Sequence, residues 1–116
     1  MNFYPISIIT FLFLSFNTVI GAEVNIYSHR QPFLINPFLE KFTEETGIKT
    51  NVVYATKGLA QRLKAEGKNS PADVILTVDI GRLYIYDDLD LLASVNSDIL
   101  ISNIPQNLKS PANKWF

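Results

Sequence analysis

Hydrophobic and polar positions after residue 22 follow two different periods, and together they predict strands that alternate with helices. Residues 24–27, 48–55 and 71–78 are short runs rich in β-branched and aromatic side chains, which is typical of strands. Apolar residues recur at helical spacing in residues 37–46, 57–67 and 81–95, and a short helical turn is expected at 98–101. Asn36 and Pro37 suit the start of the first helix, and Gly47 suits its end. This order predicts an α/β fold, an open parallel sheet with helices on both faces.

The first 22 residues contain no Lys, Arg, Asp or Glu and carry a dense apolar stretch at residues 6–16. The stretch ends at Gly21 and Ala22, small residues that suit a signal peptidase, so residues 1–22 are predicted to be a secretory signal peptide. Cleavage after Ala22 would begin the mature chain at Glu23, and cleavage after Gly21 is an alternative. An uncleaved membrane anchor is the other interpretation, although the apolar stretch is short for a membrane span. The expected location is the bacterial periplasm.

Composition restricts the remaining part of the chain, residues 23–116, which is long enough for one small domain. The net charge of −1 gives no basic surface for nucleic acid. The sequence has no cysteine, which excludes disulfides and thiolate metal sites. No histidine is paired with a plausible nucleophile and no glycine-rich phosphate loop occurs, so the sequence argues against an enzyme.

The carboxyl edge of the predicted sheet is the expected binding surface, because ligands of open α/β sheets bind outside the strand ends. Residues 27–31, 55–58 and 79–82 follow the three strands and should meet there. Arg30 and Asp79 are therefore expected near each other on that edge. His29, the only histidine, lies there too, and a lone histidine in such a loop is more often solvated than a ligand.

Three stretches of the sequence resemble a known family. They are "VNIYSHRQPFLINPFLEKFTEETGIKTNVV", "LAQRLKAEGKNSPADVILTVDIGRL" and "IPQNLKSPANKWF". They closely resemble periplasmic ferric-iron-binding proteins of ABC transporters, which are two-lobed type II periplasmic binding proteins. The resemblance implies Fe(III) in a cleft between the lobes, held mainly by two adjacent tyrosines of the second lobe with an anion such as carbonate. It also implies a monomer that delivers ferric iron to an inner-membrane ABC permease.

The family's first loop often reads Tyr-Ser-x-Arg-His-Tyr, and this sequence matches it only in part. Gln31 and Pro32 replace the last two residues, and His29 occupies the variable position, so it does not inherit a ligand role. Tyr27 matches and is a candidate metal ligand, with a packed core residue as the alternative. Arg30 also matches and, with Gln31, is a candidate for holding the anion; the alternative for Arg30 is a solvated side chain.

Asp79 falls where some relatives place a ligating glutamate after the third strand, so it is the second candidate metal ligand. The alternative is that Asp79 caps the helix expected to begin at residue 81. No Tyr-Tyr pair occurs in the 116 residues, so residues 23–116 are expected to be a partial N-terminal lobe. The predicted function is a truncated solute-binding component of a ferric-iron importer with impaired binding. The alternative is a remnant with no specific ligand.

Overall fold

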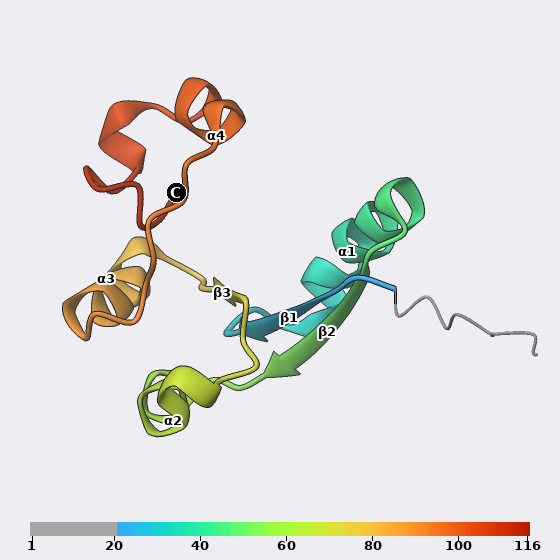
Figure 1. Ribbon diagram of the computed structural model, residues 1–116, viewed down its shortest axis with the longest axis horizontal. Coiled ribbons are helices and arrows are strands. Elements are labelled where there is room, and N and C mark those ends of the chain that lie inside the picture. The colour runs from blue at the N-terminus through green and yellow to red at the C-terminus, as the bar shows by residue number, and fades with distance from the viewer. Residues whose placement is uncertain (1–20) are drawn as a thin grey trace, which may run out of the picture.

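The computed structural model describes residues 21–116 and confirms the α/β fold with three parallel strands (Figure 1). All but the last two residues of the predicted signal peptide lie outside the described part of the chain. The strands and helices, in chain order, are β1 Glu23–Ser28, α1 Pro32–Thr46, β2 Lys49–Tyr54, α2 Leu59–Glu66, β3 Val74–Leu76, α3 Ile80–Asp88 and α4 Asp98–Asn103. Two 3₁₀ turns, Gly67–Asn69 and Gln106–Leu108, follow α2 and α4.

The first strand of the chain is the central strand of the sheet, whose order is β2-β1-β3. β1 pairs with β2 along its whole length, from Glu23 opposite Lys49 to Ser28 opposite Tyr54. One more hydrogen bond extends the pairing of β1 with β2, in which the Lys49 N–H donates to the carbonyl of Ala22 at 3.1 Å. All pairs are parallel, so the carboxyl ends of the three strands meet at one edge.

Helices cover both faces of the sheet, as expected from right-handed crossovers. The chain moves from β1 outward to β2, then back past β1 to β3, so the two crossovers place α1 and α2 on opposite faces. Tyr27 is in register with Val53 and Ile75, and all three residues pack with the α2 cluster. Ile26 and its partner Val52 therefore face the side of α1, because neighbouring residues on a strand point to opposite faces.

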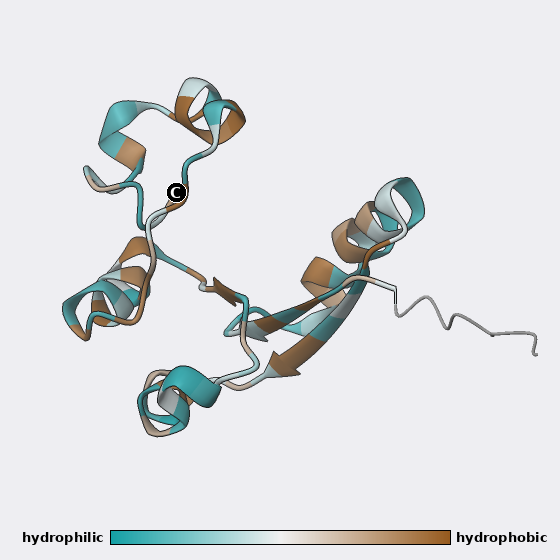
Figure 2. Cartoon of the chain, in the orientation of Figure 1, coloured by the Kyte–Doolittle hydropathy of each residue, from teal (hydrophilic) through white to brown (hydrophobic). Residues whose placement is uncertain are grey.

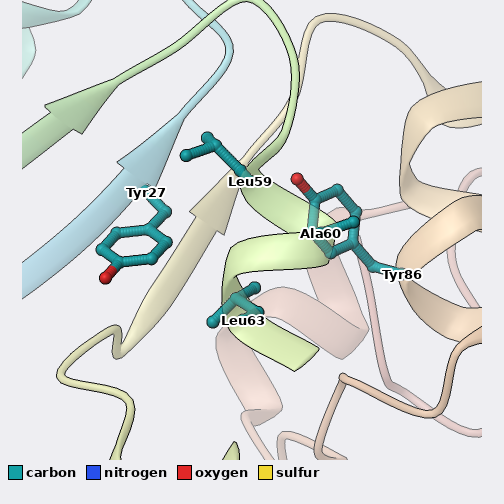
Figure 3. Close-up of a cluster of buried hydrophobic side chains, with 5 residues drawn as sticks. All are labelled: Tyr27, Leu59, Ala60, Leu63 and Tyr86. Atoms are coloured by element: carbon teal, nitrogen blue, oxygen red, sulfur yellow. The ribbon is translucent and has the colours of Figure 1, made fainter. Parts of the chain in front are cut away.

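The described core lies between the sheet and α2 and is small. Its buried members come from β1, α2 and α3 and are Tyr27, Leu59, Ala60, Leu63 and Tyr86 (Figure 3). The two tyrosines are the largest fully buried side chains, each 1% exposed. Two aromatic rings therefore contribute much of the buried surface that joins α2 and α3 to the sheet.

Three predicted element boundaries are wrong. α1 begins at Pro32 rather than near Pro37, because Pro32 occupies the first helical turn, where its missing N–H costs nothing, while Pro37 is tolerated inside the helix. β3 contains only residues 74–76, and its Val74 is 44% exposed, because β3 has β1 as its only neighbour in the sheet. α3 ends at Asp88, and the backbone of Asp90 then turns into the left-handed region at φ 54°.

The segment after α3 folds back against that helix. The indole N–H of Trp115 donates to Asp87 at 3.3 Å, and Lys114 forms ion pairs with Asp87 and Asp90 at 3.4 and 3.3 Å. These contacts raise the pKa of Lys114, chiefly through the hydrogen bond to Asp90. The end of the chain is therefore attached to α3 by polar contacts.

Hydrophobic residues occur in the strands, in the first half of α1 and in α3 and α4, whereas the last turns of α1 are hydrophilic (Figure 2). Several hydrophobic side chains are exposed, led by Phe38 of α1 at 76%, Ile99 of α4 at 73% and Phe33 of α1 at 72%. Within residues 21–116, no helix has the length and apolar character needed to cross a membrane.

Candidate binding site at the carboxyl edge of the sheet

The loops that follow the three strands are hydrogen-bonded to one another. The N–H of His29 donates to the carbonyl of Leu76 at the end of β3, at 2.8 Å. The N–H of Ala55 donates to the carbonyl of Ser28 at the end of β1, at 3.0 Å. Arg30 and Asp79 follow the ends of neighbouring parallel strands, so both lie at the same edge, as predicted.

His29 connects this edge to α3, and its imidazole is not solvated. The side chain is 8% exposed and makes two short hydrogen bonds, from Nδ1 to the carbonyl of Ala55 at 2.8 Å and from Nε2 to the hydroxyl of Tyr86 at 2.7 Å. A carbonyl only accepts, so Nδ1 carries a hydrogen and donates to Ala55, while Nε2 pairs with the hydroxyl of Tyr86. The expectation of a solvated histidine is therefore wrong, since Tyr86 and Ala55 enclose the ring.

Tyr86 of α3 packs beside His29 below this edge of the sheet. Its ring is 1% exposed, and its centroid lies 6.0 Å from that of His29. Burial raises the pKa of Tyr86, and the nearby charge of Arg82 partly opposes that shift. Tyr86 is therefore a neutral hydroxyl at physiological pH, held in place by His29.

A hollow of about 460 Å³ lies above the His29–Tyr86 pair, between the start of α2 and α3. Its lining residues are His29, Thr56, Lys57, Gly58, Ala60, Gln61, Arg82, Ile85 and Tyr86. The Arg82 guanidinium reaches across the opening, where Nη1 donates to the carbonyl of Thr56 at 2.8 Å. We call this hollow the basic pocket, because Lys57 and Arg82 are its charged lining residues.

Tyr27 lies on the face of the sheet under α2, with its hydroxyl far from the carboxyl edge. The hydroxyl donates to the carboxylate of Glu66, the last residue of α2, at 2.8 Å. α2 runs back from the carboxyl edge over eight residues, which corresponds to about 12 Å of helix. Figure 3 shows the hydroxyl pointing away from Tyr86. The ligand role of Tyr27 stays a prediction, and this position does not favour it.

The groups around the Tyr27 hydroxyl also favour its neutral form. Burial and the hydrogen bond to Glu66 raise the pKa of Tyr27. Glu66 in turn accepts from Arg62 at 2.7 Å and from Ser70 at 2.7 Å, and these bonds lower the pKa of its carboxyl, the bond from Arg62 contributing most. The Arg62 guanidinium stacks 4.7 Å from the centre of the Tyr27 ring. A phenolate ligand would have to break this arrangement.

Arg30 and Gln31 are both exposed and lie between β1 and α1. The N–H of Arg30 bonds to the hydroxyl of Ser28 at 2.9 Å, and Gln31 occupies the N-cap position of α1 without a side-chain capping bond. Neither residue lines the basic pocket. Their role in anion binding stays a prediction.

Asp79 is the N-cap of α3, the alternative that the sequence also allowed. Its Oδ1 accepts from the N–H of Arg82 at 2.9 Å, and the side chain is exposed. A Cβ on Gly81 would lie 3.2 Å from this oxygen, so the glycine leaves room for the cap. Within residues 21–116, no group of three or more His, Cys, Asp or Glu side chains lies close enough to hold a metal ion. The ligand role of Asp79 stays a prediction.

A second hollow, of about 480 Å³, lies between α1 and the first residues of β2. It is lined by residues 49–52, which are remote from the carboxyl end of that strand, and by Leu39 and Thr43 of α1. Its position separates it from the loops at the carboxyl edge, so we do not include it in the candidate site.

The sequence predicted that residues 27–31, 55–58 and 79–82 meet at one edge and placed His29 there, but it did not single out Tyr86, Lys57 or Arg82 as candidate site residues. Lys57 and Arg82 both belong to segments that were expected to meet at the edge. Their positive charge was the only feature of the sequence that could have marked them as candidate binding residues. The contact of His29 with Tyr86 joins residues 57 positions apart, and no local pattern carries it.

Relatives of this chain carry names that refer to iron. No family model matches the chain. It is 45% identical over 95 residues to iron uptake protein A1 of Synechocystis sp., a match that covers 81% of this chain and 26% of that protein. It is also 32% identical over 82 residues to the Fe(3+)-binding periplasmic protein of Serratia marcescens, covering 70% and 24%.

Solved structures agree with these relatives. The ferric iron-binding protein A of Mannheimia haemolytica, in an open conformation, matches with a TM-score of 0.79 and 48% identity, covering 83% of this chain and 30% of that one. The Trichodesmium protein solved with iron and citrate ligands matches with a TM-score of 0.76 and 41% identity, covering 82% and 30%. The chain thus spans less than a third of the length of these relatives. In sequence and in fold, it is homologous to part of the periplasmic ferric-iron-binding proteins, which are type II periplasmic binding proteins.

Proposed function

We propose that this chain forms part of the solute-binding component of a ferric-iron ABC importer. Residues 23–116 would be its N-terminal lobe, and the carboxyl edge of the sheet would be one wall of the iron cleft. The observation that carries the proposal is the joint match in sequence and fold to the Mannheimia protein, at 48% identity and a TM-score of 0.79. The partners would be ferric iron and an inner-membrane permease.

At that wall, Asp79 is the better supported of the two candidate metal ligands. Its carboxylate is exposed, and only Oδ1 has a hydrogen-bond partner among the described residues, which leaves Oδ2 free for a hard cation such as Fe(III). Arg30 and Gln31 would hold an accompanying anion such as carbonate. Tyr27 is retained as the less favoured ligand, because its hydroxyl is bonded to Glu66.

A chimera tests this proposal directly. The matching segment of the Mannheimia protein would be replaced by the corresponding part of this chain, and ferric iron would be titrated into the purified protein. We expect the chimera to form an iron complex as the parent does, because 48% of the aligned residues are identical and the folds superpose. The parent is the positive control. A chimera that shows native circular dichroism but gives no iron complex would support a remnant without a specific ligand instead.

Export through a cleaved leader is a separate part of the proposal. Its support is the charge-free apolar stretch of the first 22 residues, which ends in Gly21 and Ala22. N-terminal sequencing of protein from the periplasmic fraction should give a chain that begins at Ala22 or Glu23. A periplasmic protein that still begins at Met1 would refute cleavage.

A further inference from the structure

The strand β3 has a free edge, because it is the last strand in the order β2-β1-β3. The carbonyl of Leu76 points toward β1, where it accepts from the N–H of His29 at 2.8 Å. Successive residues of a strand direct their backbone groups to opposite sides, so the N–H and C=O of Ile75 point away from β1. Within residues 21–116, no other strand or loop bonds to the backbone of Ile75 from that side.

This edge lacks the features that usually protect a free strand. Residues 74–78 read Val-Ile-Leu-Thr-Val and contain neither a charge nor a proline. Val74 is 44% exposed and Val78 is 36% exposed. By contrast, β2 at the other edge of the sheet carries Lys49 and Asn51. An uncharged apolar edge readily pairs with another strand, so β3 is the more receptive of the two edges.

A hollow of about 320 Å³ lies beside β3. Residues 75–80 line it together with Leu83 of α3 and with Leu108, Trp115 and Phe116 of the C-terminal segment. No lining residue comes from β1, β2, α1 or α2, so the hollow lies on the free side of β3 (Figure 1). Most of the lining is apolar. A strand added at this edge could therefore place apolar side chains in the hollow.

Two acidic residues flank the free edge. Asp73 immediately precedes β3, and Asp79 follows the apolar run and lines the hollow. Both residues are exposed, and neither forms an ion pair with any residue in the range 21–116. Positive charges at both ends of an added strand would complement them.

The same charges disfavour a second copy of this chain at the edge. Two copies paired antiparallel over residues 74–78 would bring Asp73 of each copy close to Asp79 of the other. Like charges that face each other across a strand pair are destabilising. The short edge would also bury little surface compared with a stable dimer interface.

We propose that the free edge of β3 binds an extended segment of a partner protein as an added strand, and that this segment has an apolar centre and a basic residue at each end. The backbone of Ile75 would pair with the segment, and the hollow would receive its apolar side chains. Asp73 and Asp79 would select its basic ends. This inference goes beyond iron binding, and its surface shares only Asp79 with the candidate residues of the proposed iron cleft.

The test adds synthetic peptides to the purified, isotopically labelled full chain without iron and follows its NMR signals at constant ionic strength. The first peptide spans the length of residues 73–79, with lysine at both ends and alternating valine and threonine between them. We expect saturable shifts at Ile75 and Val78 with a Kd below about 1 mM. A peptide with glutamate at both ends should bind about tenfold more weakly.

A third peptide separates strand addition from simple apolar contact. It keeps the lysine ends and the same side chains, but alternate backbone nitrogens are methylated and cannot donate hydrogen bonds. It should give no saturable shift, because pairing with a strand edge needs backbone donors and acceptors. Saturable shifts at Ile75 with this peptide would overturn strand addition.

Variants of the chain test the charge selection. Asp73→Asn and Asp79→Asn should each weaken binding of the lysine-ended peptide about threefold, and added salt should reduce that difference. Asp88→Asn is the matched control, because Asp88 is an exposed residue of α3 that does not line the hollow, and it should leave the affinity unchanged. A well-dispersed spectrum verifies that each variant is folded.

The remaining outcomes also decide the proposal. Equal affinity for the lysine-ended and glutamate-ended peptides would overturn the selection of basic ends. Dimerisation of the chain in sedimentation measurements, with shifts at Ile75 that grow with protein concentration, would make a second copy the occupant and overturn the partner assignment. A chimera that fails to bind iron would leave these results unaffected, since no arm contains iron.

Discussion

At the scale of single residues, His29 shows how a side chain can matter without touching a ligand. Its backbone is bonded to Leu76 after β3, its Nδ1 to Ala55 after β2, and its Nε2 to Tyr86 of α3. One residue thus holds three segments of the candidate site, one through its backbone and two through its imidazole. The residue at the variable position of the family's loop is structural here.

His29→Phe should destabilise the chain by about 2 kcal/mol, because the hydroxyl of Tyr86 and the carbonyl of Ala55 would both lose a partner in a buried position. Urea unfolding followed by circular dichroism measures the change. Arg30→Gln is the neighbouring control, and its exposed side chain predicts a change within about 0.5 kcal/mol. Equal stabilities of the two variants would show that the two bonds of His29 contribute little.

Glu66 makes stability depend on pH in the acid range. Arg62 and Ser70 lower the pKa of its carboxyl below the ordinary value of 4.5 in the folded state. The folded state therefore binds this proton less readily than the unfolded state, so the contribution is full above 4.5 and is lost as the pH falls through the lowered pKa. The urea concentration at the unfolding midpoint of the native chain should be lower below pH 4.5 than at neutral pH. Glu66→Gln should make this difference smaller. An identical pH profile in the variant would contradict the assignment.

At the scale of elements, Asp79 has two roles that substitutions can separate. Asp79→Ala removes the cap of α3 and should cost about 1 kcal/mol of stability. Asp79→Asn keeps a capping oxygen but removes the negative charge, so it should be nearly neutral in stability. In the chimera, loss of iron affinity in both variants would indicate a metal ligand. Loss in Asp79→Ala alone would indicate only a cap.

Gly58 sets the start of α2 through its backbone conformation. Its φ of 87° lies in the left-handed region, and a Cβ added there would meet no atom within 4 Å. The cost of Gly58→Ala is therefore purely conformational, about 1 kcal/mol, and Gly58→Asn should cost less because asparagine tolerates this region better. Thermal unfolding of the two variants provides the comparison. An Ala variant as stable as the Asn variant would contradict this prediction.

The elements differ in how far the sequence could predict them. The parallel sheet with helices on both faces followed from periodicity and crossover handedness, since both are local or topological rules. The start of α1 could not be predicted in this way, because Asn36 and Pro37 look like a helix start. The structure shows that the helix begins earlier, at Pro32. The short length of β3 was not predicted, because it depends on which strands flank it in the sheet. Of the site, the segments were predictable but the long-range contact of His29 with Tyr86 was not.

At the scale of the whole molecule, the proposed function makes the chain one wall of a two-walled site. Its candidate oxygen ligands are Asp79 at the carboxyl edge and Tyr27 under α2, and the hydroxyl of Tyr27 is already bonded to Glu66. Two-lobed binding proteins gain affinity when two surfaces close around the ligand and exclude water. A single surface lacks that gain.

The purified chain alone should therefore bind Fe(III) weakly, and free citrate or phosphate should remove the metal. Phenolate coordination to Fe(III) produces a visible charge-transfer band, so titration with ferric citrate and absorbance spectroscopy make the measurement. The Mannheimia protein is the control. A stable coloured one-to-one complex that disappears in Tyr27→Phe would contradict both the weak binding and the structural role of Tyr27.

The bond from Lys49 to the carbonyl of Ala22 lies at the proposed cleavage site. If the leader is cleaved as proposed, the two possible cuts differ in what they do to this bond. A cut after Gly21 preserves the Lys49 bond, whereas a cut after Ala22 deletes its acceptor and puts a charged amine at the first residue of β1. The choice of cleavage after Gly21 or after Ala22 would therefore decide whether the pairing of β1 with β2 keeps its first hydrogen bond.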